Sequence, residues 1–264
     1  MNVLRYLRLL GIQIRASLAL GAQYRVEFLV SGVLSVFWTL LGLVPLLVLF
    51  RGGAEVAGWT YPETLVVMGW FALVKGVLEG AVNPSLVAVV DHIRKGTLDF
   101  VLLKPADAQF LVSTTRFEPW RVIDVLAGLG IMGFAFHLMG RAPGALAVLL
   151  AAAVLASATV ILYSLWILVV SAAFFVVKVD NLSFLFLSLY DAARWPADVF
   201  PWLLRAVFTF VIPLAVLTTI PAQALLGRIG PAEVLATAAG AAAFSLLARM
   251  VWKRSIGRYT SASS

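Results

Sequence analysis

The sequence predicts an all-α integral membrane protein with six transmembrane helices, preceded by an amphipathic helix at the membrane interface. Hydrophobic residues make up 62% of the 264 residues and charged residues 12%, and the mean hydropathy is +1.00. A soluble domain is about half apolar and about one quarter charged, so this chain could not hide its apolar surface in water. A helical span needs about 20 residues, and the length therefore accommodates about six spans joined by short loops.

Composition also limits the classes of function. Cysteine is absent, which excludes disulfides, thiolate metal sites and cysteine nucleophiles. The net charge of +7 is typical of a nucleic-acid-binding protein. In a chain this apolar, basic residues beside the spans are better explained by the positive-inside rule and by anionic lipid headgroups. We therefore expect membrane lipid, and no nucleic acid, as a partner.

Residues 1–27 are predicted to form a connecting helix that lies in the membrane interface. At about 100° per residue its arginines cluster on one side and a wider apolar face remains. The arginines are Arg5, Arg8 and Arg15, and the apolar face holds Leu4, Leu7, Ile14 and Leu18. The arginines also leave no clean apolar core for a signal peptide. The alternative is a leader segment of no consequence.

Residues 28–264 are predicted to form one transmembrane domain. Its apolar runs predict spans at residues 28–50, 64–83, 122–139, 145–177 and 232–252. The run 145–177 is too long for one span and too short for two, so we expect a long helix that projects beyond the bilayer. Pro45 is expected to kink the first span.

The sequence leaves the course of residues 182–230 open, because prolines interrupt it at positions 196, 201, 213 and 221. In one course, a fifth span over 182–195 precedes a re-entrant pair of short helices, residues 201–227, on the outer side. In the other, the fifth span is 203–226 and residues 182–202 lie at the inner interface. Backbone that breaks at membrane depth is tolerated only against protein or water. We take the first course as our prediction.

Lysine and arginine predict the orientation of the chain. Most of the 20 basic residues fall in segments that this topology places on one side, whereas the other side carries Arg51, Arg141 and Arg228. The positive-inside rule then predicts that both termini are cytoplasmic and that residues 91–121 lie in the cytoplasm. Arg194 and Arg205 stay unassigned.

The most charged run is DHIRKGTLDFVLLKP, residues 91–105, on the predicted cytoplasmic side. Gly96 follows two basic residues and suits a helix C-terminus with positive φ. Thr97 is the expected N-cap of a new short helix, and Asp99 falls in its first turn, where negative charge is favoured. An exposed Phe-Val-Leu-Leu sequence would then invite a protein partner. The alternative is an ordinary loop lying on lipid headgroups.

This run, with the ADAQFLVS that follows it, resembles the cytoplasmic loop of ABC-2-type exporter permeases. In that family a Gly-Thr-Leu-acidic motif precedes a leucine-rich turn and a proline. The matching residues are Gly96, Thr97, Leu98, Asp99, Leu102, Leu103 and Pro105. The Lys-Pro ending, and the proline-rich segment that begins RWPADVFPWLL before the last span, are similar to a less-studied branch grouped as a domain of unknown function.

The resemblance implies the ABC-2 exporter fold, also called type V, in which the run is a cytoplasmic coupling helix. Two ATPase subunits would dock there, through Arg94 and the seven matching residues, and would carry ATP and magnesium. The permease would form a dimer with an identical or homologous chain in a bacterial cytoplasmic membrane. Its second and fifth spans would line the dimer interface. Charged replacements at Leu98 and Leu102 are expected to uncouple ATP hydrolysis from transport.

The chain is not predicted to be an enzyme or to bind a cofactor itself. It contains no G-x-x-x-x-G-K-[ST] sequence and no Gly-Lys dipeptide, so it cannot hold nucleotide phosphates in the P-loop way. The two histidines, His92 and His137, fall on opposite predicted sides of the membrane. No metal site is therefore expected.

Lys75 and Glu79 are four residues apart on the second span, so they share one face of its helix. Charge inside a membrane is a functional hypothesis by default, and both are candidate contacts for a substrate or ion in the translocation pathway. The alternative is that they neutralise each other or pair with Asp124 or Asp191. An apolar interior with few charges suits a lipid-like, hydrophobic or amphipathic cationic substrate.

The alternative function is an ATP-independent secondary transporter, which would carry coupling-ion residues within inverted repeats. Lys75 and Glu79 are a thin basis for that function, because the sequence shows no second copy of them. A membrane scaffold that transports nothing is the third class.

Overall fold

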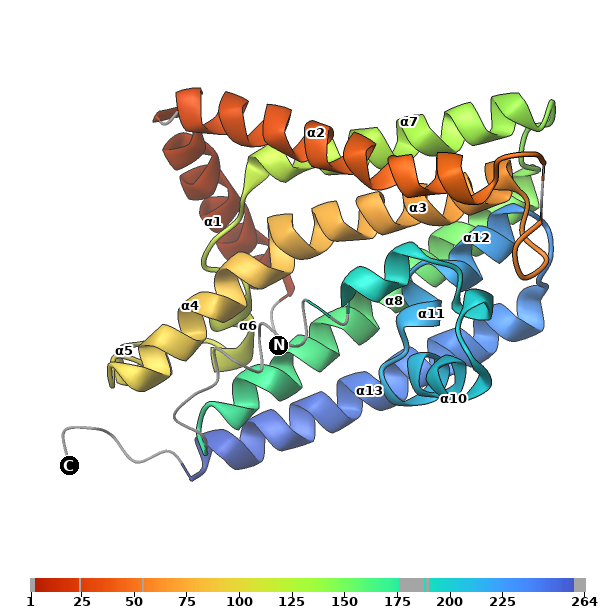
Figure 1. The fold of residues 1–264 in the computed structure, drawn as a ribbon. Helices are drawn as coiled ribbons and strands as arrows, with labels where there is room; N and C mark the ends of the chain where they lie inside the picture. The colour runs from red at the N-terminus through yellow and green to blue at the C-terminus, as the bar shows by residue number, and fades with distance from the viewer. Residues whose placement is uncertain (1–2, 24, 54, 176–187, 189, 259–264) are drawn as a thin grey trace.

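The computed structural model describes residues 3–23, 25–53, 55–175, 188 and 190–258 (Figure 1). Among these residues helices dominate, and an isolated β-bridge joins Val56 to Trp59. Five helices in this part of the chain are long and apolar enough to cross a membrane, or six if one bent helix pair counts as a span. The chain is therefore an all-α, multi-pass membrane protein.

The long helices lie where the apolar runs predict them. They are α2 (Arg25–Leu49), α3 (Tyr61–Val77), α7 (Val122–Leu138), α8 (Ala145–Ala172) and α13 (Pro231–Ile256). With 28 residues, α8 is about 42 Å long and exceeds the hydrocarbon thickness of about 30 Å, as expected for this run. It ends at Ala172, and residues 176–177 of the predicted span lie outside the described residues.

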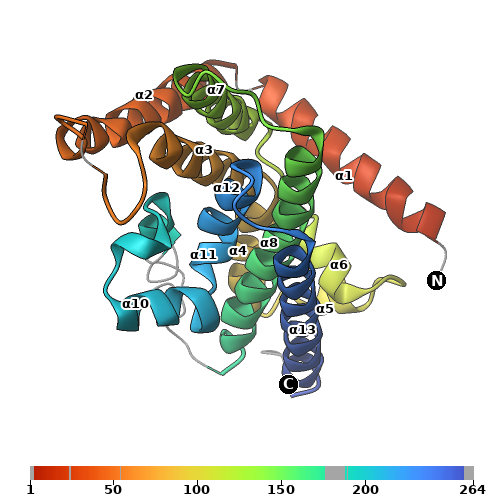
Figure 2. The same ribbon diagram turned by 90° about the vertical axis from the view of Figure 1, so that its right-hand side faces the viewer.

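The helices form two layers (Figures 1 and 2). One layer contains α2, α3 and α7, and the other contains α8 and α13. Within the layers, α3 packs along α7 and α8 along α13. The short helices α11 (Leu214–Leu217) and α12 (Thr219–Leu225) contact both α3 and α8, and so join the layers.

Glycines bring the backbones of α3 and α7 into direct contact. A Cβ atom added to Gly128 would lie 2.5 Å from the carbonyl oxygen of Gly69 and 2.8 Å from the backbone nitrogen of Leu73. A Cβ on Gly76 would lie 3.0 Å from the carbonyl oxygen of Arg121. Small residues allow this approach, which membrane helices use because water does not drive their association. The α3–α7 interface, defined by Gly69, Gly76 and Gly128, thus fixes the two spans against each other.

The second span continues well beyond α3. A π-helical turn, η1 (Leu78–Val82), leads into α4 (Asn83–Arg94), so one helical path runs from Tyr61 to Arg94. Pro84 explains the irregular turn, since it lacks an N–H group and its ring opposes regular bonding to the carbonyl of Gly80. That carbonyl instead accepts the backbone N–H of Glu118 at 2.8 Å.

Two further hydrogen bonds attach the loop that contains Glu118 to α4. The Ser85 hydroxyl donates to the carbonyl of Arg116 at 2.7 Å and accepts its backbone N–H at 2.9 Å. The loop before the 3-10 turn η2 (Pro119–Arg121) is therefore held against the start of α4.

The proline-rich segment is broken into short pieces. They are η3 (Ala192–Arg194), η4 (Ala197–Val199), α10 (Trp202–Ala206) and η5 (Val207–Val211), followed by α11 and α12. The two halves of this segment, 202–209 and 214–225, meet at a bend of 65°. Asp198 accepts a hydrogen bond from the indole N–H of Trp59 at 3.0 Å, which places η4 at the same end of the bundle as the 51–60 loop. Half of the predicted span 182–195, namely residues 182–187 and 189, lies outside the described residues.

The N-terminal helix α1 (Val3–Gln23) rests on one end of the bundle (Figure 2). Its inner face includes Ser17, whose hydroxyl accepts the backbone N–H of Phe117 at 3.1 Å. Leu4, Leu7 and Leu18 are exposed on it. Arg5, Arg8 and Arg15 are exposed as well, and the position of α1 in the membrane interface stays a prediction.

Candidate functional site

The helix α4 ends at the glycine that the sequence singles out. Gly96 has φ of 68°, its N–H group donates to the carbonyl of Ile93, and the N–H group of Thr97 donates to that of His92. These two bonds form a Schellman motif, which satisfies helix carbonyls that would otherwise lack donors. The expected helix end at Gly96 is confirmed.

The short helix that follows, α5 (Asp99–Leu102), begins one residue later than expected. Leu98 occupies the N-cap position, and no side chain caps this helix. Thr97 is therefore not the N-cap, because its hydroxyl lies 2.7 Å from Nδ1 of His92, with which it forms a hydrogen bond. No local sequence pattern indicates that this histidine would compete for the threonine.

Some apolar side chains of this segment are buried against the bundle, and others are exposed on its surface. Leu98 is fully buried and Val101 is 8% exposed, whereas Phe100 and Leu103 are 70% and 81% exposed. Leu98 therefore anchors the segment to the bundle and has no surface to offer a partner. Phe100, which the predicted docking set omits, is one of its most exposed members.

The other predicted docking residues lie between these extremes. Arg94 and Pro105 are exposed, whereas Gly96, Thr97, Asp99 and Leu102 are partly buried. The segment that follows α4, including α5, projects from the bundle at the left of Figure 1.

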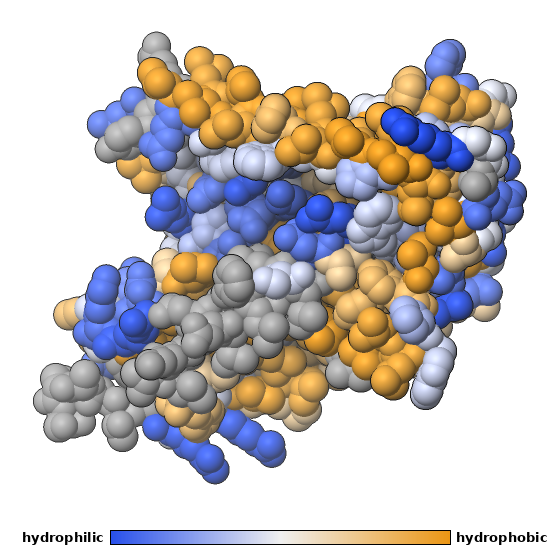
Figure 3. Space-filling model, in the orientation of Figure 1, coloured by the Kyte–Doolittle hydropathy of each residue, from blue (hydrophilic) through white to orange (hydrophobic). Residues whose placement is uncertain are grey.

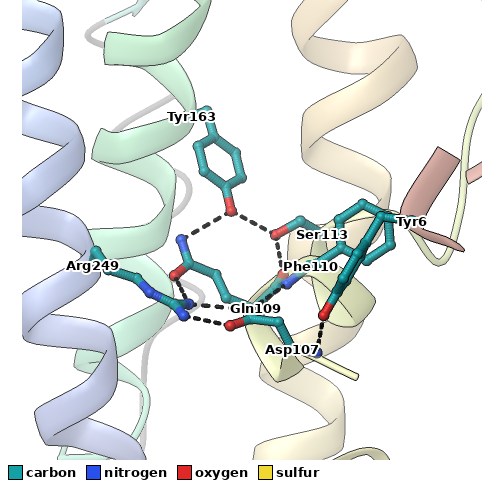
Figure 4. A network of polar contacts seen from close by, with 7 residues as sticks. All are labelled: Tyr6, Asp107, Gln109, Phe110, Ser113, Tyr163 and Arg249. Atoms are coloured by element: carbon teal, nitrogen blue, oxygen red, sulfur yellow. Dashed lines mark hydrogen bonds and ion pairs between the residues drawn. The ribbon is translucent and has the colours of Figure 1, made fainter. Parts of the chain in front are cut away.

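A polar network fixes the chain directly after this segment (Figure 4). From α13, the Arg249 guanidinium donates to both carboxylate oxygens of Asp107 and, at 2.7 Å, to the amide oxygen of Gln109. The Gln109 amide donates to the Tyr163 hydroxyl of α8 at 3.0 Å, and that hydroxyl lies 2.8 Å from the hydroxyl of Ser113. The helix α6 (Ala108–Ser113) is thereby bound to both α8 and α13.

The N-terminal helix joins the same network. The backbone N–H of Asp107 donates to the Tyr6 hydroxyl at 3.0 Å, and the Tyr6 ring packs edge-on against Phe110 with centroids 4.8 Å apart. Arg5 donates to the carbonyl of Pro105 at 2.6 Å. The segment 97–107 is thus held at its far end by α1, α8 and α13 together.

Asp107 also caps α6, since its carboxylate accepts the backbone N–H of Phe110 at 3.1 Å. The hydrogen bond from Arg249 lowers the pKa of Asp107 from its ordinary value near 3.8, and the N–H of Phe110 acts in the same direction against partial burial. A sequence signal for the cap existed, because Asp precedes this helix. The bond to Arg249 had none, because 142 residues separate the two.

Lys75 and Glu79 do not pair with each other. Glu79 accepts a hydrogen bond from the Asn83 amide at 3.1 Å and forms an ion pair with Arg121 at 3.5 Å. Arg121 also pairs with the buried Asp124 at 3.2 Å, and Asp124 accepts a hydrogen bond from the Ser35 hydroxyl. Glu79 therefore belongs to a structural cluster that connects the second span with α2 and α7.

Lys75 lies instead in a cavity of about 260 Å³. Its walls come from α2, α3, α7 and the 191–194 segment, with Trp38, Leu43, Met68, Phe71 and Ile131 among the lining residues. Asp191, which also lines it, pairs with Arg194 at 3.1 Å. Among the described residues, neither predicted acidic partner forms an ion pair with Lys75. A hydrophilic hollow lies beneath the apolar surface of α2 in Figure 3.

In the part of the chain that the structure describes, no group of three or more histidine and carboxylate side chains is arranged to hold a metal ion. His92 lies near the end of α4, and His137 lies near the opposite end of the bundle, in the last turn of α7. The structure therefore does not bring the two histidines together.

The sequence of this chain matches a known protein family. The family model described as "ABC-2 family transporter protein" matches residues 36–263, most of the chain. No curated protein and no solved structure matches this chain.

Proposed function

Because this chain belongs to the ABC-2 family of transporter proteins, and is thus a membrane permease, we propose that it is the membrane subunit of an ABC exporter powered by a separate ATPase. The matched region includes every predicted docking residue and both intramembrane candidates, Lys75 and Glu79. ATP and magnesium would be bound by the ATPase. Family membership counts against an ATP-independent secondary transporter.

The observation that carries this proposal is the exposure of Phe100 and Leu103 on a segment that is fixed at both ends. At one end the Schellman motif at Gly96 fixes its direction, and at the other the Asp107–Arg249 bonds attach it to the bundle. Large apolar side chains on a rigid, charged segment outside the spans are typical of a protein interface. We assign Phe100 and Leu103, with Arg94 and Pro105 beside them, as the ATPase-docking surface.

The structure offers a route by which docking would reach the membrane. The docking segment follows α4, and α4 is continuous with α3, which carries Lys75. A displacement of the segment therefore acts on the second span directly. The network around Asp107 would pass the same displacement to α8 and α13. ATP binding and hydrolysis would bias these elements between two states.

For the membrane, we propose a bacterial cytoplasmic membrane with both termini and α5 on the cytoplasmic side, as the distribution of basic residues favours. The bond between Asp198 and Trp59 supports a re-entrant course for residues 201–227 on the outer side. We place α1 in the inner interface, with Leu4, Leu7 and Leu18 toward lipid.

We propose a dimer of permease chains, identical or homologous, with two ATPase subunits. The share of residues buried within the chain is 72% in the most apolar stretch of the second span but 17% in that of α2. The second span thus has little surface left for a partner chain. The exposed apolar face of α2, visible along the top of Figure 3, suits the second permease chain better.

The double variant Phe100→Glu with Leu103→Glu tests the docking surface. We expect it to insert and fold normally, because both side chains are exposed, but to lose co-purification of the P-loop ATPase and ATP-driven transport. Val87→Glu, the same kind of change at an exposed position of α4 outside the membrane, is the control and should retain both. Wild-type recovery of the ATPase with the double variant would refute the assignment.

The buried residue of the motif provides a contrast. Leu98→Glu places a charge in the core, so we expect loss of folded protein and not uncoupling. From the sequence, charged replacements at Leu98 and Leu102 are expected to uncouple ATP hydrolysis from transport. From the structure, we expect the loss of ATP-driven transport from charged replacements at Phe100 and Leu103 instead.

A further inference from the structure

The charges around the Lys75 cavity are not balanced. Of the residues that line it, Lys75, Asp191 and Arg194 are charged. Asp191 is engaged by Arg194, both through the ion pair and through a bond from the guanidinium to its backbone carbonyl at 3.0 Å. The nearest acidic residue on the same helix, Glu79, is engaged by Arg121 and Asn83. The cavity therefore has an excess of one positive charge.

The 190–194 segment that closes this cavity is firmly attached to α3. Tyr190 stacks on Phe71 with ring centroids 5.2 Å apart, and its hydroxyl donates to the Phe71 carbonyl at 3.3 Å. The Arg194 guanidinium lies over the same ring at 5.5 Å from its centroid. Arg194 is thus committed to Asp191 and Phe71, whereas no described side chain pairs with the Lys75 ammonium.

The remaining walls of the cavity are mainly apolar. They include Trp38 and Leu43 from α2, Met68 from α3 and Ile131 from α7. An ammonium group in such surroundings, at a position within a span, is costly unless an anion or water compensates it. The volume of about 260 Å³ is slightly below that of cavities for drug-sized ligands, and it fits a charged headgroup with the first part of an apolar tail.

We propose that this cavity binds an amphipathic anion, with its carboxylate or phosphate on Lys75 and its apolar part against Trp38, Leu43 and Ile131. This inference rests on the proposed function and gives the transported substrate a chemical class. Of the lipid-like, hydrophobic and amphipathic cationic substrates that composition suits, it argues against the cation, because the uncompensated charge in the cavity is positive. The same chemistry is present in the headgroup of an anionic phospholipid and in a free amphiphile.

The test uses the full-length permease in complex with its ATPase, in nanodiscs of neutral phosphatidylcholine. Dodecyl phosphate, dodecyltrimethylammonium and dodecyl maltoside are compared as probes, and binding is measured by their effect on ATPase activity and on thermal unfolding. We expect the phosphate alone to bind. Lys75→Met should weaken its binding about tenfold, since a charge-assisted hydrogen bond is lost, and Lys75→Arg should retain most of it. Lys253→Met, at an exposed position in α13, is the matched control.

A second arm replaces part of the phosphatidylcholine by phosphatidylglycerol. Competition with dodecyl phosphate would identify an anionic lipid as a ligand, and its absence would identify a free amphiphile; both support the proposal. Equal binding of the cationic probe, or unchanged phosphate binding by Lys75→Met, would overturn it. So would a change in oligomeric state in Lys75→Met, which would make Lys75 a contact between chains. None of these results depends on how well the ATPase co-purifies with the permease. Failure of the ATPase to co-purify with the wild-type permease would refute the proposed function instead.

Discussion

The α3–α7 interface and the polar network around α6 hold the molecule together by different physical means. In the α3–α7 interface, glycine backbones touch, and there is no space for a single added carbon atom at Gly128. In the network, side chains from α1, α8 and α13 meet α6 through hydrogen bonds. The Asp107 and Arg249 side chains are 29% and 37% exposed, so water can replace their bonds.

This difference indicates which parts of the chain move together. A close-packed backbone contact has no intermediate arrangements, so α3 and α7 are expected to move as one body. Solvent-exposed hydrogen bonds break and re-form at modest cost. The end of the bundle at which we propose that the ATPase docks is therefore the end that we expect to rearrange.

The largest effect is expected from Gly128→Ala, which breaks the tighter of the two regions. The added methyl group would overlap the backbone of Gly69 and Leu73, and we expect a loss of about 3 kcal/mol of stability, seen as a lower melting temperature in detergent. Gly130→Ala, whose added Cβ would have no neighbour within 4 Å, should melt like the wild type. Equal melting temperatures for the two variants would show that the interface is not tightly packed.

A smaller effect is expected in the network. Arg249→Gln removes the charge-assisted bonds to Asp107, and because the pair is partly exposed we expect a loss of about 1 kcal/mol. In a double-mutant cycle with Asp107→Asn, the two losses should be less than additive. Strict additivity would mean that the two side chains do not interact in the membrane-embedded protein.

A comparable loss is expected at the end of α4, which lies at the other end of the 97–107 segment from the network. Gly96→Ala forces a residue with a Cβ atom into the left-handed region at φ of 68°, at a cost of about 1 kcal/mol. Since this glycine sets the direction of the docking segment, ATPase co-purification should fall together with stability. Retained co-purification in a destabilised Gly96→Ala variant would separate the helix end from docking.

The smallest effect is expected from pH. The folded state lowers the pKa of Asp107, so its stabilising contribution is complete above its ordinary pKa near 3.8 and is lost as the pH falls through the lowered value. Stability of the wild type should therefore decline more steeply below about pH 4 than that of Asp107→Asn. Parallel profiles for the two proteins would rule out Asp107 as the titrating group.

Local features of this protein were readable from its sequence, and long-range ones were not. The helix end at Gly96 was predicted correctly because a Schellman motif depends on a few adjacent residues. Periodicity placed Lys75 and Glu79 on one face, but they do not pair with each other: Arg121, the ion-pair partner of Glu79, lies 42 residues beyond it. Leu98 matched a family motif, yet its burial depends on packing that no local pattern encodes.

The proline in the second span has a mechanical consequence. Helical bonding is interrupted at the carbonyl of Gly80, so the torsional stiffness of the path from Tyr61 to Arg94 is lowest at the π-helical turn. The bonds of Glu118 and Arg116 bridge that turn from outside the helix. A rotation of α4 about its own axis would therefore be shared between the helix backbone and residues 116–118, and in the proposed exporter this short loop would set how much of the rotation reaches the membrane.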